Sequence, residues 1–391
     1  MNDPTPAPVA ANERIEFLDV LRGVALFGIL VVNLPFLGMP MSEAMGGPSI
    51  WEGGGANAWA SALIRALAQN KFMTLFSTLF GIGLALQVDR AAARGVEPSS
   101  FYPRRLMLLA VFGVLNGTMI FFGDILLPYA IAGSVLYLLR KKSPRTMLWI
   151  ATASLVIGVT LSVIFEGLLG GGEGDGMGYD LRAAEVALAE GSFLEGSAAR
   201  GMIYMGWLVL SSMTAFNWRI MALFLVGAVL LRGGLVTQDR APLHRRVMIL
   251  GLSIGLACES CSLLLHGRQD LDVALRVVDV LLHELGGLAL SAGYAGAVAT
   301  WCWSGGLSKL RRGIASTGRM ALTNYLGQNI VAGLIFYGHG LGLYGEFSQP
   351  QIFVMCIVIY SAQVALSSAW MARVSGGPLE LLWRWLTYPR R

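Results

Sequence analysis

The sequence predicts an all-α, polytopic membrane protein, a bundle of about ten transmembrane helices with both termini in the cytoplasm. Of its 391 residues, 55% are hydrophobic and only 14% are charged, whereas an average soluble domain has about 25% charged residues. The apolar residues also fall in long runs, and about 20 consecutive apolar residues cross a bilayer as a helix. The net charge of +5 comes from basic loops, so nucleic acid is not expected as a partner.

Ten apolar runs give the expected spans: residues 17–38, 66–87, 105–122, 124–140, 146–169, 214–234, 247–265, 280–304, 320–338 and 351–372. Lys and Arg gather in alternate connections, and such basic loops lie in the cytoplasm. They are residues 88–105, 140–145, 232–246, 305–319 and the C-terminal tail. The alternation holds if 200–234 crosses once. Residues 200–216 are ambiguous, being an interfacial helix, a re-entrant segment or part of a long sixth helix.

We expect one membrane domain, 14–391, after a Pro/Ala-rich disordered tail, 1–13. The tail lacks the basic region and cleavage site of a secretory signal. The domain divides into a five-span half (14–169), an outer Gly-rich loop with an interfacial helix (170–213), and a second five-span half (214–391). The four cysteines fall in or beside apolar runs, which favours buried thiols over disulfides. Two of them form CESC, but without a second pair no metal site is expected.

The first span carries three polar residues, Asp19, Arg22 and Asn33. Arg22 and Asn33 lie on one helix face, offset by about 20°, and Asp19 can pair with Arg22 at i+3. Because polar groups inside a membrane are costly unless they face protein or water, this face is expected to point into the bundle. The alternative is that Asp19 and Arg22 are interfacial charges that reach the headgroups.

A second set of polar residues is expected near the outer ends of the spans. A carboxylate near an imidazole, partly dehydrated, is typical of general base chemistry. Each residue also has a structural interpretation: a turn acceptor for the aspartate, an interfacial anchor for the lysine, and packing for the histidines. Glu259 needs a partner because it lies in mid-span. The candidate catalytic residues are Asn33, Lys71, Asn116, Asp124, His283 and His339.

Arginines gather instead at the inner ends of the spans, where guanidinium groups can bind phosphates in bidentate contacts. The alternative for them is inside-positive topology with lipid headgroup contacts. Asn324 and Gln328 lie at i, i+4 and face a ligand or a neighbouring helix. The candidate cofactor-binding residues are Arg22, Arg104, Arg105, Arg319, Asn324 and Gln328.

The chain resembles the YeiB family of bacterial inner-membrane proteins from Arg14 to Tyr388. The resemblance is carried by LDVLRGVALFGILVVN, KFMTLFSTLFGIGLAL, RRLMLLAVFGVLNGTMIFFGDILLPYAIAG, GRMALTNYLGQNI, YGHGLGLYG and GPLELLWRWLTY. That family is distantly similar to transmembrane acyltransferases, the heparan-alpha-glucosaminide N-acetyltransferase and acyltransferase-3 group. The resemblance implies acetyl-CoA or another acyl-CoA as the cytoplasmic donor and the bacterial inner membrane as the location. It also implies a His before the GDIL turn, where this chain has Asn116, so His283 or His339 would supply a required imidazole.

Two functions follow as hypotheses. In the first, an acyl group passes to an envelope or exported acceptor, a small molecule or a glycan. Asp124 or a nearby His would deprotonate the acceptor, while Lys71 and Asn33 hold the acyl oxygen. In the second, the protein is a transporter or permease of a small polar metabolite, in which Glu259 titrates. Membrane lipids are expected partners, and a homodimer is left open.

Overall fold

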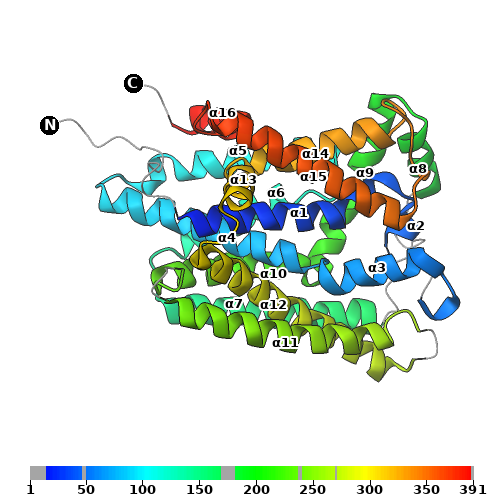
Figure 1. Cartoon of the computed structure of the whole chain (residues 1–391), viewed down its shortest axis with the longest axis horizontal. Helices are drawn as coiled ribbons and strands as arrows, with labels where there is room; N and C mark the ends of the chain where they lie inside the picture. Colours follow the sequence, from blue (N-terminus) through cyan, green and yellow to red (C-terminus); the bar gives the residue numbers. More distant parts are fainter. Residues whose placement is uncertain (1–14, 46–49, 169–180, 237–239, 269–270, 389–391) are drawn as a thin grey trace.

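The computed structural model describes residues 15–45, 50–168, 181–236, 240–268 and 271–388. The predicted disordered tail and residues 170–180 of the predicted Gly-rich loop lie outside these ranges. The described residues form helices that run mostly along the long axis of one bundle (Figure 1).

The α-helices are α1 (Glu16–Gly38), α2 (Met41–Ala44), α3 (Gly55–Leu67), α4 (Lys71–Ala93), α5 (Tyr102–Met119), α6 (Leu126–Leu138), α7 (Pro144–Ser162), α8 (Leu181–Ala189), α9 (Phe193–Met213), α10 (Ala215–Arg232), α11 (Ala241–Leu265), α12 (Val273–Ser304), α13 (Ser308–Arg319), α14 (Ala321–Phe336), α15 (Gln349–Met371) and α16 (Pro378–Thr387). A π-helical segment, η4 (Val163–Leu168), continues α7, and 3₁₀ segments occupy Ile50–Glu52 and Pro98–Ser100.

Within the described residues, six helical segments are long and apolar enough to cross a membrane. They are Glu16–Gly38, Gly55–Ala93, Pro144–Phe165, Ala215–Arg232, Ala241–Leu265 and Gln349–Met371. The predicted class of helical membrane protein is therefore confirmed. The other four predicted spans overlap α5, α6, α12 and α14, and the count of ten stays a prediction.

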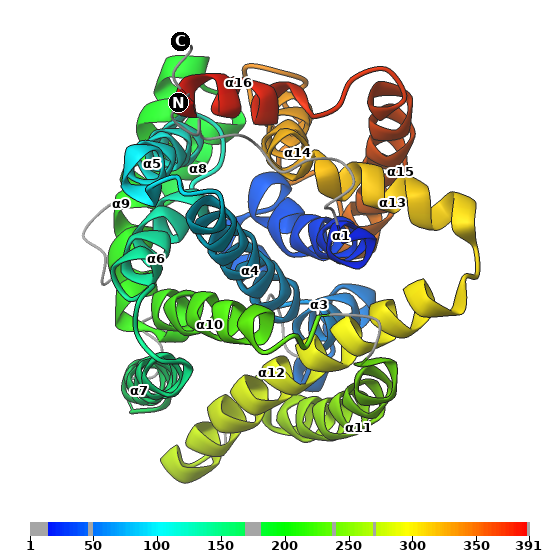
Figure 2. The same ribbon diagram turned by 90° about the vertical axis from the view of Figure 1, so that its left-hand side faces the viewer.

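The six segments divide into central and peripheral ones. The windows in α1, α3–α4 and α10 are 67%, 61% and 50% buried, whereas those in α7, α11 and α15 are 22%, 22% and 17% buried. Figure 2 shows α1 and α4 in the middle of the bundle and α7 and α11 at its edge. The peripheral helices expose large apolar side chains, such as Trp149, Leu250 and Leu366. Lipid is the solvent that suits these faces.

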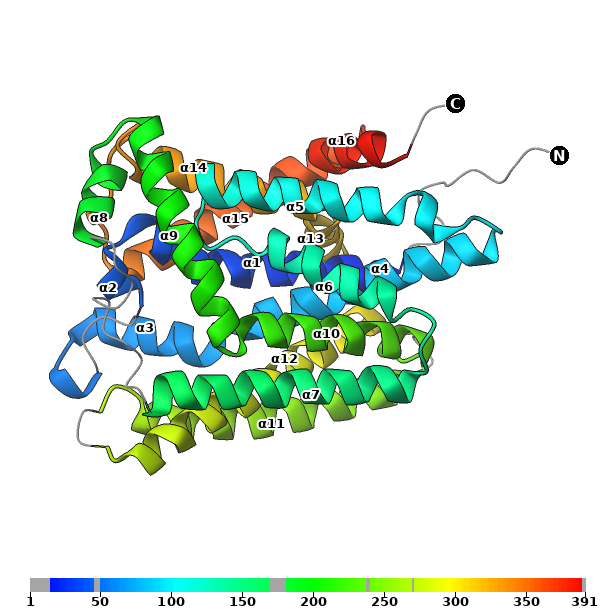
Figure 3. The same cartoon turned by 180° about the vertical axis from the view of Figure 1, so that it is seen from behind.

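The bundle has two distinct ends. The first residues of α1 and the whole of α16 lie at one end, which we name the termini end (Figure 1). Helices α2 and α8 lie at the opposite end, which we name the far end (Figure 1). The connections predicted to be basic join helices at the termini end, as α4 to α5 and α6 to α7 do in Figure 3.

Several helices begin or end inside the bundle. Helix α6 has 13 residues, a length of about 20 Å that falls short of a ~30 Å hydrocarbon core. Its first turn lies in the interior (Figure 3), and Asp124, just before it, has an exposed fraction of 0%. Asp124, expected near the outer end of its span, is therefore buried, while the neighbouring Gly123 is partly exposed. Irregular backbone at such depth is tolerated where protein or a cavity surrounds it.

Two further helix breaks coincide with the first residues of predicted spans, 214–234 and 320–338. Helix α9 ends at Met213, and extended backbone at Thr214 separates it from α10. Residues 200–216 thus belong mostly to a separate helix that buries Arg200, Ile203 and Tyr204. Helices α13 and α14 are likewise separated at Met320.

Glycines allow α4 to approach α10. A Cβ at Gly81 would lie 2.6 Å from the Phe224 Cα, whereas a Cβ at Gly83 would meet only the Arg22 Nη2 atom, at 3.4 Å. We therefore expect Gly81→Ala to force the helices apart at a cost of about 1–3 kcal/mol. The matched Gly83→Ala should leave the thermal unfolding midpoint in detergent nearly unchanged. Equal midpoints for the two variants would contradict the predicted close approach.

Candidate functional site

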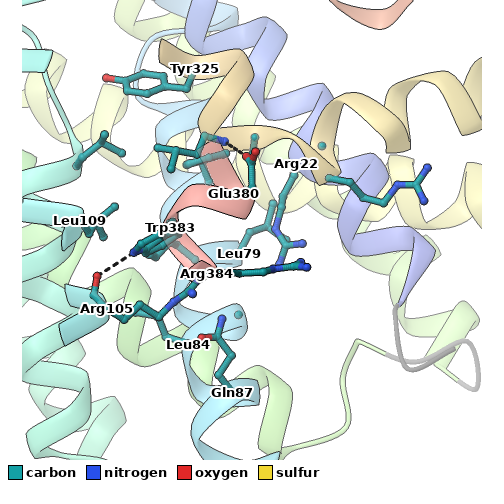
Figure 4. A pocket seen from close by; sticks show the side chains of 18 residues that line it. Arg22, Leu79, Leu84, Gln87, Arg105, Leu109, Tyr325, Glu380, Trp383 and Arg384 are labelled. Atoms are coloured by element: carbon teal, nitrogen blue, oxygen red, sulfur yellow. Dashed lines mark hydrogen bonds between the residues drawn. The ribbon is translucent and has the colours of Figure 1, made fainter. Parts of the chain in front are cut away.

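A cavity of about 220 Å³ lies toward the termini end, between α1, α4, α5, α6, the α13–α14 junction and α16. Four arginines and one glutamate line it: Arg22, Arg105, Arg319, Arg384 and Glu380. Figure 4 shows Arg22, Arg105 and Arg384 reaching the same space from three different helices. The rest of the wall is mostly apolar. Such a cavity favours a ligand with an anionic group and an apolar portion.

The only glutamate among the cavity residues is already fully used by the protein. Its carboxylate accepts hydrogen bonds from the Leu322 N–H at 2.7 Å, the Thr323 N–H at 3.1 Å and the Thr323 hydroxyl at 2.6 Å. Glu380 thereby caps the first turn of α14, where a carboxylate stabilises the helix. These three hydrogen bonds hold the carboxylate against the beginning of α14.

Two of the arginines keep hydrogen-bonding capacity for a ligand. The buried Nε atoms of Arg105 and Arg319 have no hydrogen-bond partner. Arg105 stacks over Trp383, with its Cζ 3.6 Å from the ring centroid, and the Trp383 Nε1–H donates to the Arg105 carbonyl at 3.1 Å. Arg22 forms an ion pair with Asp19 at 2.9 Å, as its i+3 spacing predicted. Helix α16 thus fixes the orientation of Arg105 within the wall.

Three of the four predicted inner arginines therefore meet in one cavity. Arg104 is the exception, because it is exposed and does not line the cavity. Asn324 is also placed elsewhere: its side-chain amide donates to the Thr317 carbonyl at 3.0 Å and to the Ser367 hydroxyl at 2.9 Å. These contacts tie α14 to α13 and α15, so the interhelical alternative describes Asn324.

A second centre surrounds Asp124, at the beginning of α6. Its carboxylate accepts from the Asn116 side-chain amide at 2.9 Å and from the Leu127 N–H at 3.0 Å. The Asn329 amide donates to the Asn116 oxygen at 3.4 Å. Asp124, Asn116 and Asn329 each have an exposed fraction of 0%. Asp124 does act as a turn acceptor, but it does so in the interior, with α5 and α14 as neighbours.

The cavity and the Asp124 centre share one stretch of chain. Leu126, two residues after Asp124, lines the cavity, and so does Tyr325, one turn before Asn329 on α14. Tyr325 is 1% exposed and its hydroxyl has no hydrogen-bond partner. Figure 4 shows Tyr325 across the cavity from the Arg105 and Arg384 side. A ligand held by the arginines would thus point its other end toward the Asp124 segment.

A third centre joins α4, α11 and α12. The Lys71 ammonium lies 2.7 Å from a Glu259 carboxylate oxygen, and the other oxygen lies 3.0 Å from the His283 Nδ1 atom. The Lys71 and Glu259 side chains are 0% and 2% exposed. The Asn70 amide lies 3.2 Å from the His283 Nε2 atom. The mid-span glutamate therefore has the partner that the membrane requires.

The predicted outer layer is thus divided between separate centres. Lys71 and His283 share a centre with Glu259, whereas Asp124 and Asn116 share another, and no described histidine contacts Asp124. His339 lies at the far end, where its ring contacts Phe193 with 5.2 Å between centroids. Asn33 is partly exposed and forms no side-chain hydrogen bond with a described residue. The chemistry proposed for the layer as one site does not fit this arrangement.

Residues absent from the prediction complete these centres. Trp383, Arg384 and Glu380 belong to α16, whose basic residues indicated only topology in the sequence. Asn329, in LTNYLGQN, lies at i+5 from Asn324 and at i+1 from Gln328, so the pair Asn324 and Gln328 does not mark its helix face.

Comparisons with known proteins match this chain over nearly its whole length. A family model described as "Protein of unknown function (DUF418)" matches residues 230–390. The uncharacterized protein YxaH of Bacillus subtilis (strain 168) is 31% identical over 399 residues, covering 97% of this chain and 96% of the relative. The uncharacterized protein YeiB of Escherichia coli (strain K12) is 30% identical over 385 residues and covers 96% of each. An uncharacterized 39.9 kDa protein of Bacillus acidopullulyticus is 28% identical over 391 residues, with 98% and 96% covered.

Proposed function

Because this chain belongs to the YeiB family of bacterial membrane proteins, we propose that it is a transmembrane acyltransferase. In this proposal the arginine-lined cavity binds an acyl-CoA donor from the cytoplasm. The acyl group then passes to a hydroxyl or amine of an envelope or exported acceptor. The proposal includes the ten-span topology, the cytoplasmic location of both termini and insertion in the inner membrane.

One observation carries the proposal: the basic cavity and the buried Asp124 centre meet at the segment 124–126. A thioester donor has the matching polarity, with phosphates at one end and an apolar arm and acyl group at the other. The volume of about 220 Å³ is below the ~300–1,000 Å³ of sites for drug-sized ligands. The cavity would therefore enclose the phosphates and part of the arm, with the nucleoside toward the termini end.

The residues then take separate roles. Arg105 and Arg319 bind the donor phosphates through charge-assisted hydrogen bonds. The oxygen or nitrogen of the acceptor attacks the thioester carbonyl, and Asp124 takes the proton from that acceptor atom. The carbon–sulfur bond breaks, and the CoA thiolate leaves and takes up a proton. The Asn116 amide holds the Asp124 carboxylate in position.

The test is a calorimetric titration of purified protein with acetyl-CoA. We expect Arg105→Ala and Arg319→Ala each to weaken binding by about 10- to 100-fold, because each removes a charged hydrogen bond worth ~1.5–3 kcal/mol. Arg104→Ala is the matched control, since its neighbouring but exposed side chain lies outside the cavity. Equal weakening by Arg104→Ala and Arg105→Ala, or no binding to the wild type, would contradict the proposal.

A transporter of a small polar metabolite is the second candidate. The helix breaks at Thr214 and Met320 and the buried pair Lys71–Glu259 favour it, since transporters bind substrates at interrupted helices. The transporter would be favoured if the purified protein does not bind acetyl-CoA and, after reconstitution into proteoliposomes, exchanges a metabolite across the membrane.

A further inference from the structure

Several buried polar groups that lack hydrogen-bond partners lie between the far end of the bundle and Asp124. Arg200 of α9 is 0% exposed, yet its Nε and Nη1 atoms have no hydrogen-bond partner. The Tyr204 hydroxyl and the Asn329 side-chain oxygen also lack a partner, and the Tyr337 hydroxyl faces the Arg200 guanidinium. Such groups are rare in native proteins, and an absent ligand or water is one explanation.

These groups lie on α9, on α14 and at Tyr337 directly after α14, and α9 packs against α5. Arg200 and Tyr204 are four residues apart, which places them on the same face of α9. Tyr204 packs on α5, since a Cβ at Gly117 would lie 2.6 Å from the Tyr204 Cε1 atom. One residue before Gly117, Asn116 holds Asp124 and contacts Asn329 of α14. Tyr204, on the Arg200 face of α9, therefore packs against the same turn of α5 that holds the proposed general base through Asn116.

In the part of the chain that the structure describes, Arg200 is surrounded by a hydroxyl and aromatic rings. Its Nη2 atom donates to the Ser197 hydroxyl at 2.8 Å, and its Cζ lies 5.0 Å from the Tyr337 ring centroid and 5.7 Å from that of Phe193. Among the described residues no carboxylate forms an ion pair with it. A buried charge without a counterion costs several kcal/mol, so this guanidinium is suited to bind an anion supplied from outside.

The site lies close to the surface of the far end. The His339 ring, which is partly exposed, contacts the Tyr337 ring with 5.8 Å between centroids and borders the same space through Phe193. Burial, and then the positive charge of Arg200, lower the pKa of His339. Gly338 N–H donates to the Leu188 carbonyl at 3.0 Å, which fixes the loop after α14 against α8.

We propose that Arg200 binds an anionic group, a phosphate or a carboxylate, of the acceptor. Ser197 and Tyr337 supply hydroxyl groups beside it, and the rest of the acceptor extends along α9 past Tyr204 to Asp124. The identification of the ligand as the acyl acceptor rests on the proposed function. The anion site at Arg200 does not depend on it. Phosphate is shared by soluble metabolites and lipid headgroups, and the experiment separates the two sources.

The test measures thermal unfolding midpoints in neutral detergent with inorganic phosphate. The Arg105→Ala background is used throughout, because it weakens anion binding in the inner cavity. Phosphate at about ten times its dissociation constant should raise the midpoint by ~2 °C for a chain of 391 residues. The rise should vanish in Arg200→Gln and persist in Arg182→Gln, whose arginine is exposed on neighbouring α8. An equal rise in both variants would overturn the proposal.

Two further measurements identify the source of the anion and provide a second variant. Nanodiscs of phosphatidylglycerol are compared with phosphatidylcholine: an Arg200-dependent rise only in the former identifies a lipid headgroup. No Arg200-dependent rise with phosphate, acetate or lipid overturns the site. If Arg200→Gln does not fold, Tyr337→Phe removes one hydroxyl, and it should weaken phosphate binding about 3- to 10-fold. Unchanged binding there would contradict the proposal.

Acetyl-CoA binding separates this inference from the proposed function. In the otherwise wild-type protein, Arg200→Gln should bind acetyl-CoA normally, because the inner cavity lies toward the opposite end. Loss of phosphate protection in Arg200→Gln, together with no acetyl-CoA binding by the wild type, would retain the anion site and remove the acyltransferase.

Discussion

Lys71→Met is expected to destabilise the protein by about 3–5 kcal/mol, because it leaves a buried carboxylate without its counterion. The Lys71 ammonium lies 2.7 Å from Glu259, and both side chains are almost fully buried. Glu259→Gln should be harmful for the same reason, since it leaves the ammonium unpaired. The thermal unfolding midpoint in detergent checks both.

The double variant decides whether the pair is coupled. Lys71→Met combined with Glu259→Gln removes both charges, and we expect it to be clearly more stable than the sum of the single effects predicts. Lys141→Met is the matched control, because Lys141 is exposed, and it should change the midpoint little. Strict additivity of the two single variants would show that no coupled ion pair exists in the membrane.

Asp124→Asn is expected to reduce acyl transfer by at least about 100-fold, the range for loss of a general base. The measurement is release of CoA thiol from acetyl-CoA by purified protein mixed with an extract of bacterial envelope. The amide retains one oxygen for the Leu127 N–H, so the fold and acetyl-CoA binding should persist.

Asp272→Asn is the matched control for that change. Asp272 accepts the Leu275 N–H at 2.9 Å, the same i to i+3 contact that Asp124 makes with Leu127, but it is exposed at the start of α12. Asp272→Asn should leave activity unchanged. If Asp124→Asn retains full activity, Asp124 is a turn acceptor and no more.

The sequence predicted the helix ranges better than it predicted how deep in the bundle each helix begins and ends. The first apolar run, 17–38, matches α1 almost to the residue. The second, 66–87, joined parts of two helices, because Asn70 adopts a left-handed conformation with φ of 67° between α3 and α4. Hydropathy also does not show that α6 begins in mid-bundle, since buried and lipid-facing turns are equally apolar.

Parts of the candidate site followed from the sequence in the same way. Arg22, Arg105 and Arg319 were grouped by the inner ends of their spans, and the structure brings them to one cavity. Arg104 was grouped with them, although successive helical residues point about 100° apart and cannot share one face. The separation of Lys71 from Asp124 depends on which helices pack together, which no local pattern reveals.

Photolabelling with an acyl-CoA that carries its reactive group on the acyl chain tests the central claim most directly. If the donor extends from the arginines to the Asp124 segment, the label should attach near Leu126, which belongs to that segment and lines the cavity, or near Tyr325, which lies across the cavity from Arg105. Unlabelled acetyl-CoA should compete for the labelling, and Arg105→Ala should weaken it. Labelling confined to the lipid-facing helices α7, α11 and α15, or labelling without competition, would contradict the claim.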